Sequence, residues 1–166
     1  MAVTGKIDRK YMAHYIDAGS LCGGLTPKYE RLGKDLEEYN VELNPDTETS
    51  KNILGESTFK HNGYEVSSDA DPFYADTTSD LFTALQKIVD GRLKDDSLKT
   101  KAVEVHLWTE ATAGKYEAYQ QDCYVVPTSY GGDTSGYQIP FTVNYVGERV
   151  KGKFDINSGT FTADSE

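Results

Sequence analysis

The stretch that decides the fold is Ser79-Asp80-Leu81-Phe82-Thr83-Ala84-Leu85-Gln86-Lys87-Ile88-Val89-Asp90-Gly91-Arg92-Leu93. Its large apolar side chains recur at the spacing of one helical face, and they are Leu81, Phe82, Leu85, Ile88 and Val89. Ser79 suits the cap of the first turn, Asp80 suits the positive end of the helix dipole, and Gly91 suits the exit. The pattern therefore predicts an amphipathic helix over 79–93, which needs a sheet on which to bury its stripe.

Around this stretch the chain shows mostly strand and turn patterns. Apolar and polar residues alternate over 102–108 and again over 115–126, as in half-buried strands. The alternation continues over 137–156 and is interrupted at Gly147-Glu148, which predicts a C-terminal hairpin there. We therefore expect a mainly β fold with one α-helix, in which two packed antiparallel sheets form a β-sandwich or half-barrel flanked by the helix.

The chain length of 166 residues indicates a single domain with its own core. Residues 1–27 are mixed in character, contain a glycine cluster and lack a sustained stripe, so we expect an N-terminal arm that becomes ordered on assembly. Residues 28–166 then form the β domain. Within it, 34–59 is polar and predicts an extended loop or hairpin, and Asn62-Gly63 is a hairpin-turn signal.

Charge and composition disfavour several kinds of partner. The formal net charge of -10 and the pI near 4.7 argue against direct binding to nucleic acid or to an anionic membrane. Cys22 and Cys123 are too few for a disulfide framework, so we expect free thiols. The sequence contains no apolar run of membrane-spanning length and no signal peptide, which predicts a protein made and folded in a cytoplasm.

The sequence predicts no catalytic residues, no cofactor and no enzymatic activity. His14, His61 and His106 lie in the expected arm, in a turn signal and on a strand face, without a companion motif. Neither Cys22 nor Cys123 has a local cysteine-protease signature, and nothing resembles the elbow that carries a nucleophilic serine.

A calcium loop is the one metal site that the acidic residues suggest. Asp69, Asp71 and Asp76 precede the helix and suggest a calcium loop that starts at Asp69. Tyr74 stands at the sixth position, where the loop needs glycine, and Asp80 stands at the twelfth, where it needs glutamate. We therefore predict no metal site.

Two other surfaces have alternative interpretations. His106 and Trp108 on one strand face could stack against a sugar, but an exposed tryptophan is equally typical of a protein interface. The predicted 137–156 hairpin has few charges before Glu148, although exposed strand edges usually carry charge or proline. That hairpin either pairs with another chain, which favours self-assembly, or belongs to an ordinary monomer.

Four segments before the predicted helix are Tyr29-Glu30-Arg31-Leu32-Gly33-Lys34-Asp35-Leu36, Glu38-Tyr39-Asn40, Asn44-Pro45-Asp46-Thr47-Glu48-Thr49 and Ile53-Leu54-Gly55-Glu56-Ser57. These segments and the order of the predicted elements resemble those of bacteriophage major tail tube proteins over Lys28 to Ala163. The single helix and the terminal hairpin follow in the family's order. An insertion, Val41-Glu42-Leu43, departs from the family's pattern and puts the local turn in doubt.

The resemblance implies a structural virion protein of a long-tailed phage. Six subunits would form a ring whose inner sheets join into a barrel of about 24 strands, wide enough for an aqueous bore, and the rings would stack into the tail tube. The implied partners are further copies of the chain, the tape measure protein in the bore, the tail terminator and distal tail or baseplate proteins. DNA would pass without specific binding, and assembly would occur in the host cytoplasm. A carbohydrate-binding β-sandwich is the alternative.

Overall fold

The computed structural model describes residues 2–165. Its strands are β1 (Met12–Asp17), β2 (Tyr29–Leu32), β3 (Val41–Glu42), β4 (Pro45–Lys51), β5 (Ser57–Tyr64), β6 (Ser67–Ala70), β7 (Lys99–His106), β8 (Lys115–Pro127), β9 (Gly131–Asp133), β10 (Gly136–Gln138), β11 (Phe141–Asp155) and β12 (Thr160–Ala163). Its helices are α1 (Asp80–Gly91) and the short 3-10 helices η1 (Arg9–Tyr11), η2 (Ala18–Gly23) and η3 (Asp95–Leu98).

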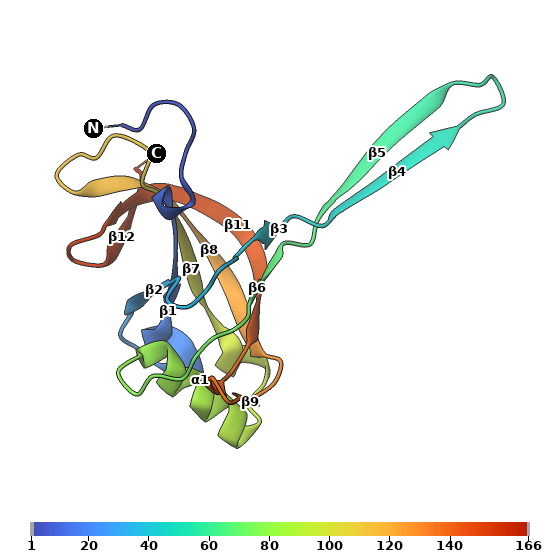
Figure 1. Cartoon of the computed structure of the whole chain (residues 1–166). Helices are drawn as coiled ribbons and strands as arrows, with labels where there is room; N and C mark the ends of the chain where they lie inside the picture. The colour runs from blue at the N-terminus through green and yellow to red at the C-terminus, as the bar shows by residue number, and fades with distance from the viewer. Residues whose placement is uncertain (1, 166) are drawn as a thin grey trace.

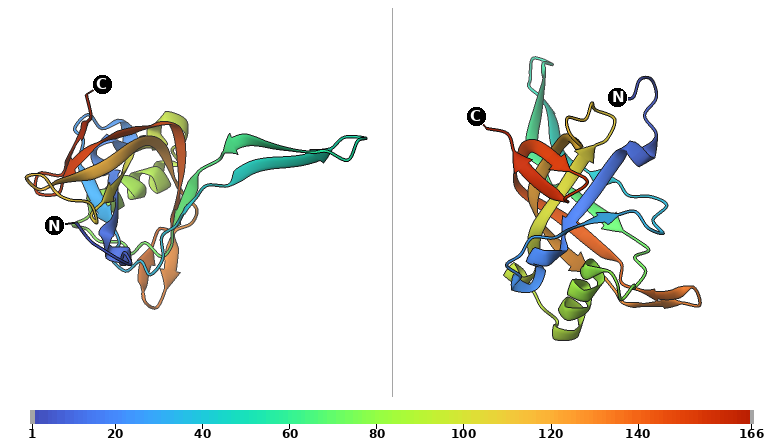
Figure 2. Two further views of the ribbon diagram at one scale, coloured as in Figure 1. Left: turned by 90° about the horizontal axis from the view of Figure 1, so that it is seen from above. Right: turned by 90° about the vertical axis from the view of Figure 1, so that its left-hand side faces the viewer.

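One curled antiparallel sheet forms the body of the molecule (Figure 1). Its strand order is β2-β1-β7-β8-β11-β6-β3, and β12 also pairs with β11. Two further pairs, β4–β5 and β9–β10, project from this body as separate ribbons (Figure 2). The predicted mainly β fold with one α-helix is confirmed for residues 2–165, in the half-barrel form of that prediction.

The predicted helix is confirmed and lies at one end of the curled sheet (Figure 1). Ser79 caps it, since its hydroxyl oxygen accepts the Phe82 backbone N–H at 3.1 Å. Arg92, rather than Gly91, adopts the left-handed conformation at the C-terminus, with a φ of 48°. The buried residues of the helix join one core cluster with η2 and the sheet, and they are Leu81, Ala84, Leu85, Ile88 and Val89.

The second half of the expected N-terminal arm is part of the sheet. Met12–Asp17 forms β1, which pairs with β2 on one side and with β7 on the other. Ala13 and Ile16 are each only 1% exposed, because they lie on opposite faces of a strand that is covered on both sides. The prediction of a separate arm over 1–27 is therefore wrong for Met12–Asp17. For the residues before Met12, ordering on assembly stays a prediction.

The predicted C-terminal hairpin over 137–156 is wrong. Residues Phe141–Asp155 form one long strand, β11, which pairs with β8 at both ends and lacks partners only at 147–149. The register shifts between Val146 and Val150, where Gly147 has a φ of 71°. A glycine at positive φ suits a bulge as well as a turn, and here long-range pairing selects the bulge. Residues 157–159 form the turn that joins β11 to β12.

The extended segment predicted over 34–59 includes the first strand of a hairpin, whose second strand continues to Tyr64. β4 and β5 pair from Pro45–Tyr64 to Lys51–Ser57. The turn lies at Asn52, whose side-chain oxygen accepts the backbone N–H groups of Leu54 and Glu56 at 2.9 and 3.0 Å. The predicted Asn62-Gly63 turn is wrong, because these residues lie within β5 at a register shift.

Leu85→Asp should abolish cooperative folding. Leu85 is 0% exposed, so the substitution buries an unpaired carboxylate, and such changes cost more than about 4 kcal/mol. Circular dichroism and thermal melting would measure the loss. Lys87→Asp, two residues further along the same helix on its exposed side, should keep a cooperative transition. A folded Leu85→Asp protein would instead show that the stripe serves an interface.

Candidate functional site

The ribbon formed by β4 and β5, here called the arm, projects away from the half-barrel (Figures 1 and 2). All residues of β4 are exposed, and in β5 only Gly63 is partly covered. Ile53 at the tip is fully exposed, while Leu54 and Phe59 are 76% and 65% exposed. A two-stranded hairpin is marginally stable in water on its own. An arm with so much exposed apolar surface therefore has the character of an interaction site.

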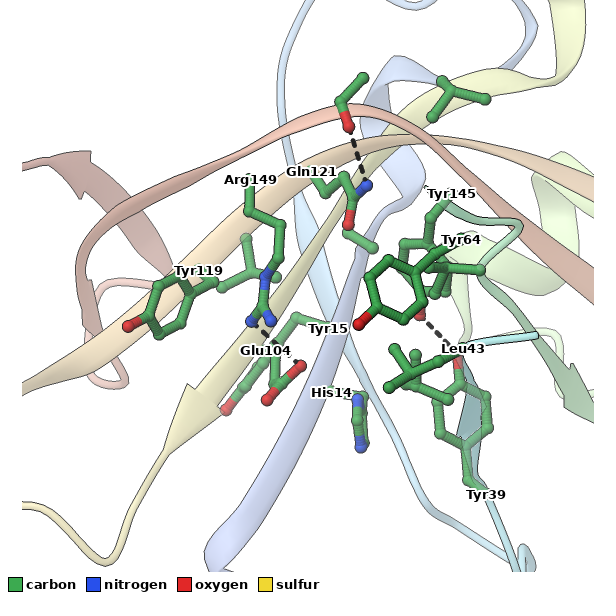
Figure 3. Close-up of a pocket in the computed structure, with 16 residues that line it drawn as sticks. His14, Tyr15, Tyr39, Leu43, Tyr64, Glu104, Tyr119, Gln121, Tyr145 and Arg149 are labelled. Carbon is green, nitrogen blue, oxygen red and sulfur yellow. Dashed lines mark hydrogen bonds and ion pairs between the residues drawn. The ribbon is translucent and has the colours of Figure 1, made fainter. Parts of the chain in front are cut away.

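A cavity of about 710 Å³ lies at the base of the arm (Figure 3). Much of its wall is aromatic, so we call it the tyrosine groove. The side chains that define it are Tyr39, Tyr64, Tyr119, Tyr145, Leu43 and Val146. Tyr64 is the last residue of the arm and Leu43 lies just before it, whereas the others come from the sheet and from the segment before β3. The groove is therefore built by residues from widely separated parts of the chain.

Strand alternation on β8 explains why the groove lies beside the core. Tyr119, Gln121, Cys123 and Val125 point to the same face of the sheet, because side chains alternate along a strand. Cys123 and Val125 are buried in the cluster that contains the helix. Tyr119 and Gln121 lie beyond the reach of the helix and line the groove instead.

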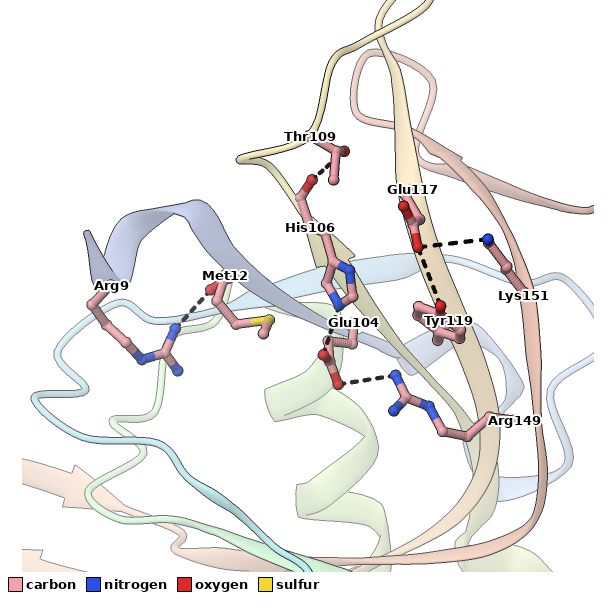
Figure 4. Close-up of polar contacts among 9 residues, drawn as sticks. All are labelled: Arg9, Met12, Glu104, His106, Thr109, Glu117, Tyr119, Arg149 and Lys151. Atoms are coloured by element: carbon pink, nitrogen blue, oxygen red, sulfur yellow. Dashed lines mark hydrogen bonds and ion pairs between the residues drawn. The ribbon is translucent and has the colours of Figure 1, made fainter. Parts of the chain in front are cut away.

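The charged side chains of the groove are paired with one another (Figure 4). Glu104 forms an ion pair with Arg149 at 3.3 Å, and its other carboxylate oxygen lies 2.8 Å from His106 Nε2. The hydrogen bond with His106 holds the pKa of Glu104 below its usual value, and Arg149 adds to this effect. Arg149 also stacks over Tyr119, with 4.2 Å between the guanidinium carbon and the ring centroid.

The floor of the groove is neutral and hydrogen-bonded. The hydroxyls of Tyr39 and Ser68 lie 2.6 Å apart, and the Tyr145 hydroxyl lies within 3.3 Å of both. Burial raises the pKa of each of these tyrosines. The His14 ring packs 4.7 Å from that of Tyr39, and burial, with Arg9 nearby, lowers the pKa of His14 to about 4. This floor suits contact with a neutral or apolar group.

The structure separates the predicted acidic loop residues. The Thr142 hydroxyl donates to Asp69 at 2.8 Å, while Asp76 accepts from Thr78 and from Lys34. In the described part of the chain, no group of three His, Cys, Asp or Glu side chains is arranged to hold a metal. The Asp69 and Asp76 carboxylates thus have local roles.

The cysteines and histidines occupy unrelated places. Cys22 lies in η2 and Cys123 is buried in β8, where burial raises its thiol pKa to about 12. His61 lies on the arm against Tyr64, and His106 stacks on Trp108 with 4.3 Å between ring centroids. Between residues 2 and 165, no helix is both long and apolar enough to cross a bilayer.

Sequence reasoning missed the tyrosine groove, and in particular the pairing of Glu104 with Arg149. The available signal was the period-two spacing of Glu104 and His106 on one strand and of Tyr119 and Gln121 on the next. That spacing places polar and aromatic side chains on one face. It does not show that the two strands are neighbours, which only the fold decides.

Comparison with protein-family models and with curated proteins found no match. Among solved structures, the sheath/tube terminator of an extracellular contractile injection system, PVC, in its extended state matches with a TM-score of 0.49 and 10% identity, over 90% of this chain and 99% of that one. The tube-terminating cap of the anti-feeding prophage matches with the same two values, over 91% and 93%. Both come from tail-type particles, and neither is a major tail tube protein. Similarity at this level carries no argument about function.

The half-buried His14 should make the stability of the fold depend on pH. Its folded pKa of about 4 lies below the ordinary 6.5, so the unfolded chain binds the proton more tightly. The stabilisation is complete above pH 6.5 and is lost as the pH falls to about 4, by roughly 3 kcal/mol at most. Urea unfolding across this range should give a flatter profile for His14→Gln than for the unmodified chain. Parallel profiles would contradict the assignment.

Proposed function

We propose that this chain is a structural subunit that self-assembles through its arm into stacked hexameric rings of a tail tube. The observation that carries the proposal is the exposed arm itself, which has no core of its own and presents Ile53, Leu54 and Phe59 to solvent. A chain that keeps such a surface in water gains by burying it against another chain.

The energetics favour an assembly of many copies over an isolated pair. Burying the three exposed apolar side chains of the arm gains about 1.5–3 kcal/mol each. Association itself costs an estimated 4–15 kcal/mol, so one arm contact alone is weak. In a closed ring the contacts act together, and avidity makes the assembly stable. The proposal therefore expects monomers at low concentration.

The edges of the sheet fit side-by-side packing in a ring. One edge is β2 and the other is β3, which contains only two residues. In the proposed ring, β2 of one copy lies beside β3 of the next, so that the sheets join into the barrel wall. Such short edge strands limit uncontrolled pairing of single copies.

The proposed tube is the conduit for genomic DNA in a phage tail. The net charge of -10 supports passage without adhesion, because an acidic wall repels DNA. The proposed partners are the tape measure protein in the bore and the terminator and distal proteins at the ends of the tube. The role is non-catalytic.

The structure does not favour the carbohydrate-binding alternative. A sugar platform needs an open aromatic face, but the His106 ring stacks on Trp108 at an interplanar angle of 17°. One face of the indole is therefore covered by the chain itself.

Replacing residues 46–63 by a short Gly-Ser linker should give a folded protein that no longer assembles. The arm is exposed and lies outside both core clusters, so its removal leaves the core intact. Sedimentation velocity and negative-stain microscopy of the full chain should show rings or tubes at high concentration, and the arm-less variant should sediment as a monomer. The variant with Thr58→Ser on the arm is a matched control and should assemble normally.

A full chain that stays monomeric at all concentrations and salts would refute the proposal. Rings formed by the arm-less variant at the same concentration as by the full chain would refute the role of the arm.

A further inference from the structure

We propose that the tip of the arm, Ile53 and Leu54, docks into the tyrosine groove of a second copy of the chain. This inference rests on the proposed function. It adds the surface that receives the arm and the direction in which copies of the chain contact one another. The tip is the most exposed apolar part of the arm, and the groove is a cavity of about 710 Å³ lined mostly by aromatic and apolar side chains.

The groove has the chemistry of an acceptor for apolar side chains. Leu43, Tyr64 and Val146 on its wall are 54%, 59% and 37% exposed, so apolar surface remains uncovered. Its volume of about 710 Å³ falls in the range of cavities that hold drug-sized molecules, which is ample for two aliphatic side chains. An arm tip docked there would therefore remove apolar area from water on both sides of the contact.

The groove is also bordered by an unpaired strand edge. On the side of β11 away from β8, β6 pairs as far as Asn144 and β12 pairs from Gly152 onward. The backbone from Val146 to Val150 therefore has no strand beside it on that edge within the described structure. The Gly147 carbonyl accepts the Gln121 side-chain amide at 3.1 Å, but a hairpin that enters the groove still meets a strand edge without a neighbouring strand as well as apolar side chains, as in β-strand addition.

A chain cannot fill its own groove. Leu43 and Tyr64 of the groove lie at the base of the arm, and the arm extends straight from there through seven paired residues (Figure 2). At about 3.3 Å per residue, the tip lies roughly 20 Å from the base. The occupant must therefore come from another chain.

The charges of the arm and the groove favour a second copy of this protein as the chain that occupies the groove. Most of the surface of a protein with a net charge of -10 repels another copy. The arm is nearly balanced, since its acidic residues exceed its lysines by one, with Asp46, Glu48 and Glu56 against Lys51 and Lys60. In the groove, Arg149 offsets Glu104. The two surfaces are therefore places where copies of an acidic chain meet without strong repulsion.

Docking of this kind gives the assembly a direction. Each chain carries one tip and one groove, so the contact is head-to-tail, and until a ring closes it leaves a free tip at one end and a free groove at the other. The contact therefore propagates from copy to copy and does not end at a dimer.

Complementation between two defective variants tests the proposal. Ile53→Ser combined with Leu54→Ser removes the tip, and Val146→Glu places a charge in the groove. Each variant alone should associate at least tenfold more weakly than the full chain in sedimentation velocity. Mixing the two leaves one intact tip and one intact groove per pair, so a weak 1:1 complex should form at high protein concentration, where neither variant associates alone. All three positions are exposed, and unchanged thermal melting would verify that both variants fold.

Disulfide trapping locates the contact. In a Cys22→Ser background, a chain with Ile53→Cys mixed with a chain with Val146→Cys should form a disulfide-linked pair on mild oxidation. A control mixture with Lys87→Cys in place of Val146→Cys should not. If Val146→Glu assembles like the full chain and no 53–146 disulfide forms, the docking is refuted while assembly through the arm stands. If the full chain does not associate at all, both proposals fail.

Discussion

The antiparallel ladder between β8 and β11 is the interaction on which the rest of the structure depends. These are the longest strands described, and they pair from Phe141–Pro127 to Asp155–Lys115. Strands of this length cannot stay flat, because each twists in a right-handed sense, and a bulge increases the twist locally. The bulge at Gly147 sits near the middle of the ladder, so the sheet curls about that point.

The curl divides the structure into a core and a groove. At one end of the curled sheet, the helix covers the apolar side chains, and the two elements bury each other in one cluster. At the bulge, the same face of the sheet is not covered, and Val146, Gly147 and Arg149 turn toward the groove. Past the bulge, Phe154 faces a second cluster together with Phe161 of β12. A single irregularity in β11 thus determines which side chains are core and which remain available for contact.

The features that the sequence predicted correctly are those set by local chemistry. The helix followed from a stripe and a serine cap that lie within fifteen residues, and the mainly β fold followed from alternation within each strand. Gly147 and Asn62-Gly63 were misassigned because turns and bulges use the same positive φ, and only the pairing partner distinguishes them. β1 and the groove depend on contacts between distant segments, which no local pattern encodes. Glu104 and Arg149 are 45 residues apart in the chain.

Assembly through a projecting arm requires that the arm be ordered before it meets a partner, because ordering a flexible loop would consume much of the gain from contact. Asparagines at both ends of the arm supply that order. At the base, the Asn44 side chain donates to the Glu65 carbonyl at 2.9 Å, and at the turn, Asn52 accepts two backbone N–H groups. The seven pairs of the ladder between these caps fix the length of the arm. A fixed length is what a repeating assembly needs, since every copy then places its tip at the same distance from its own body.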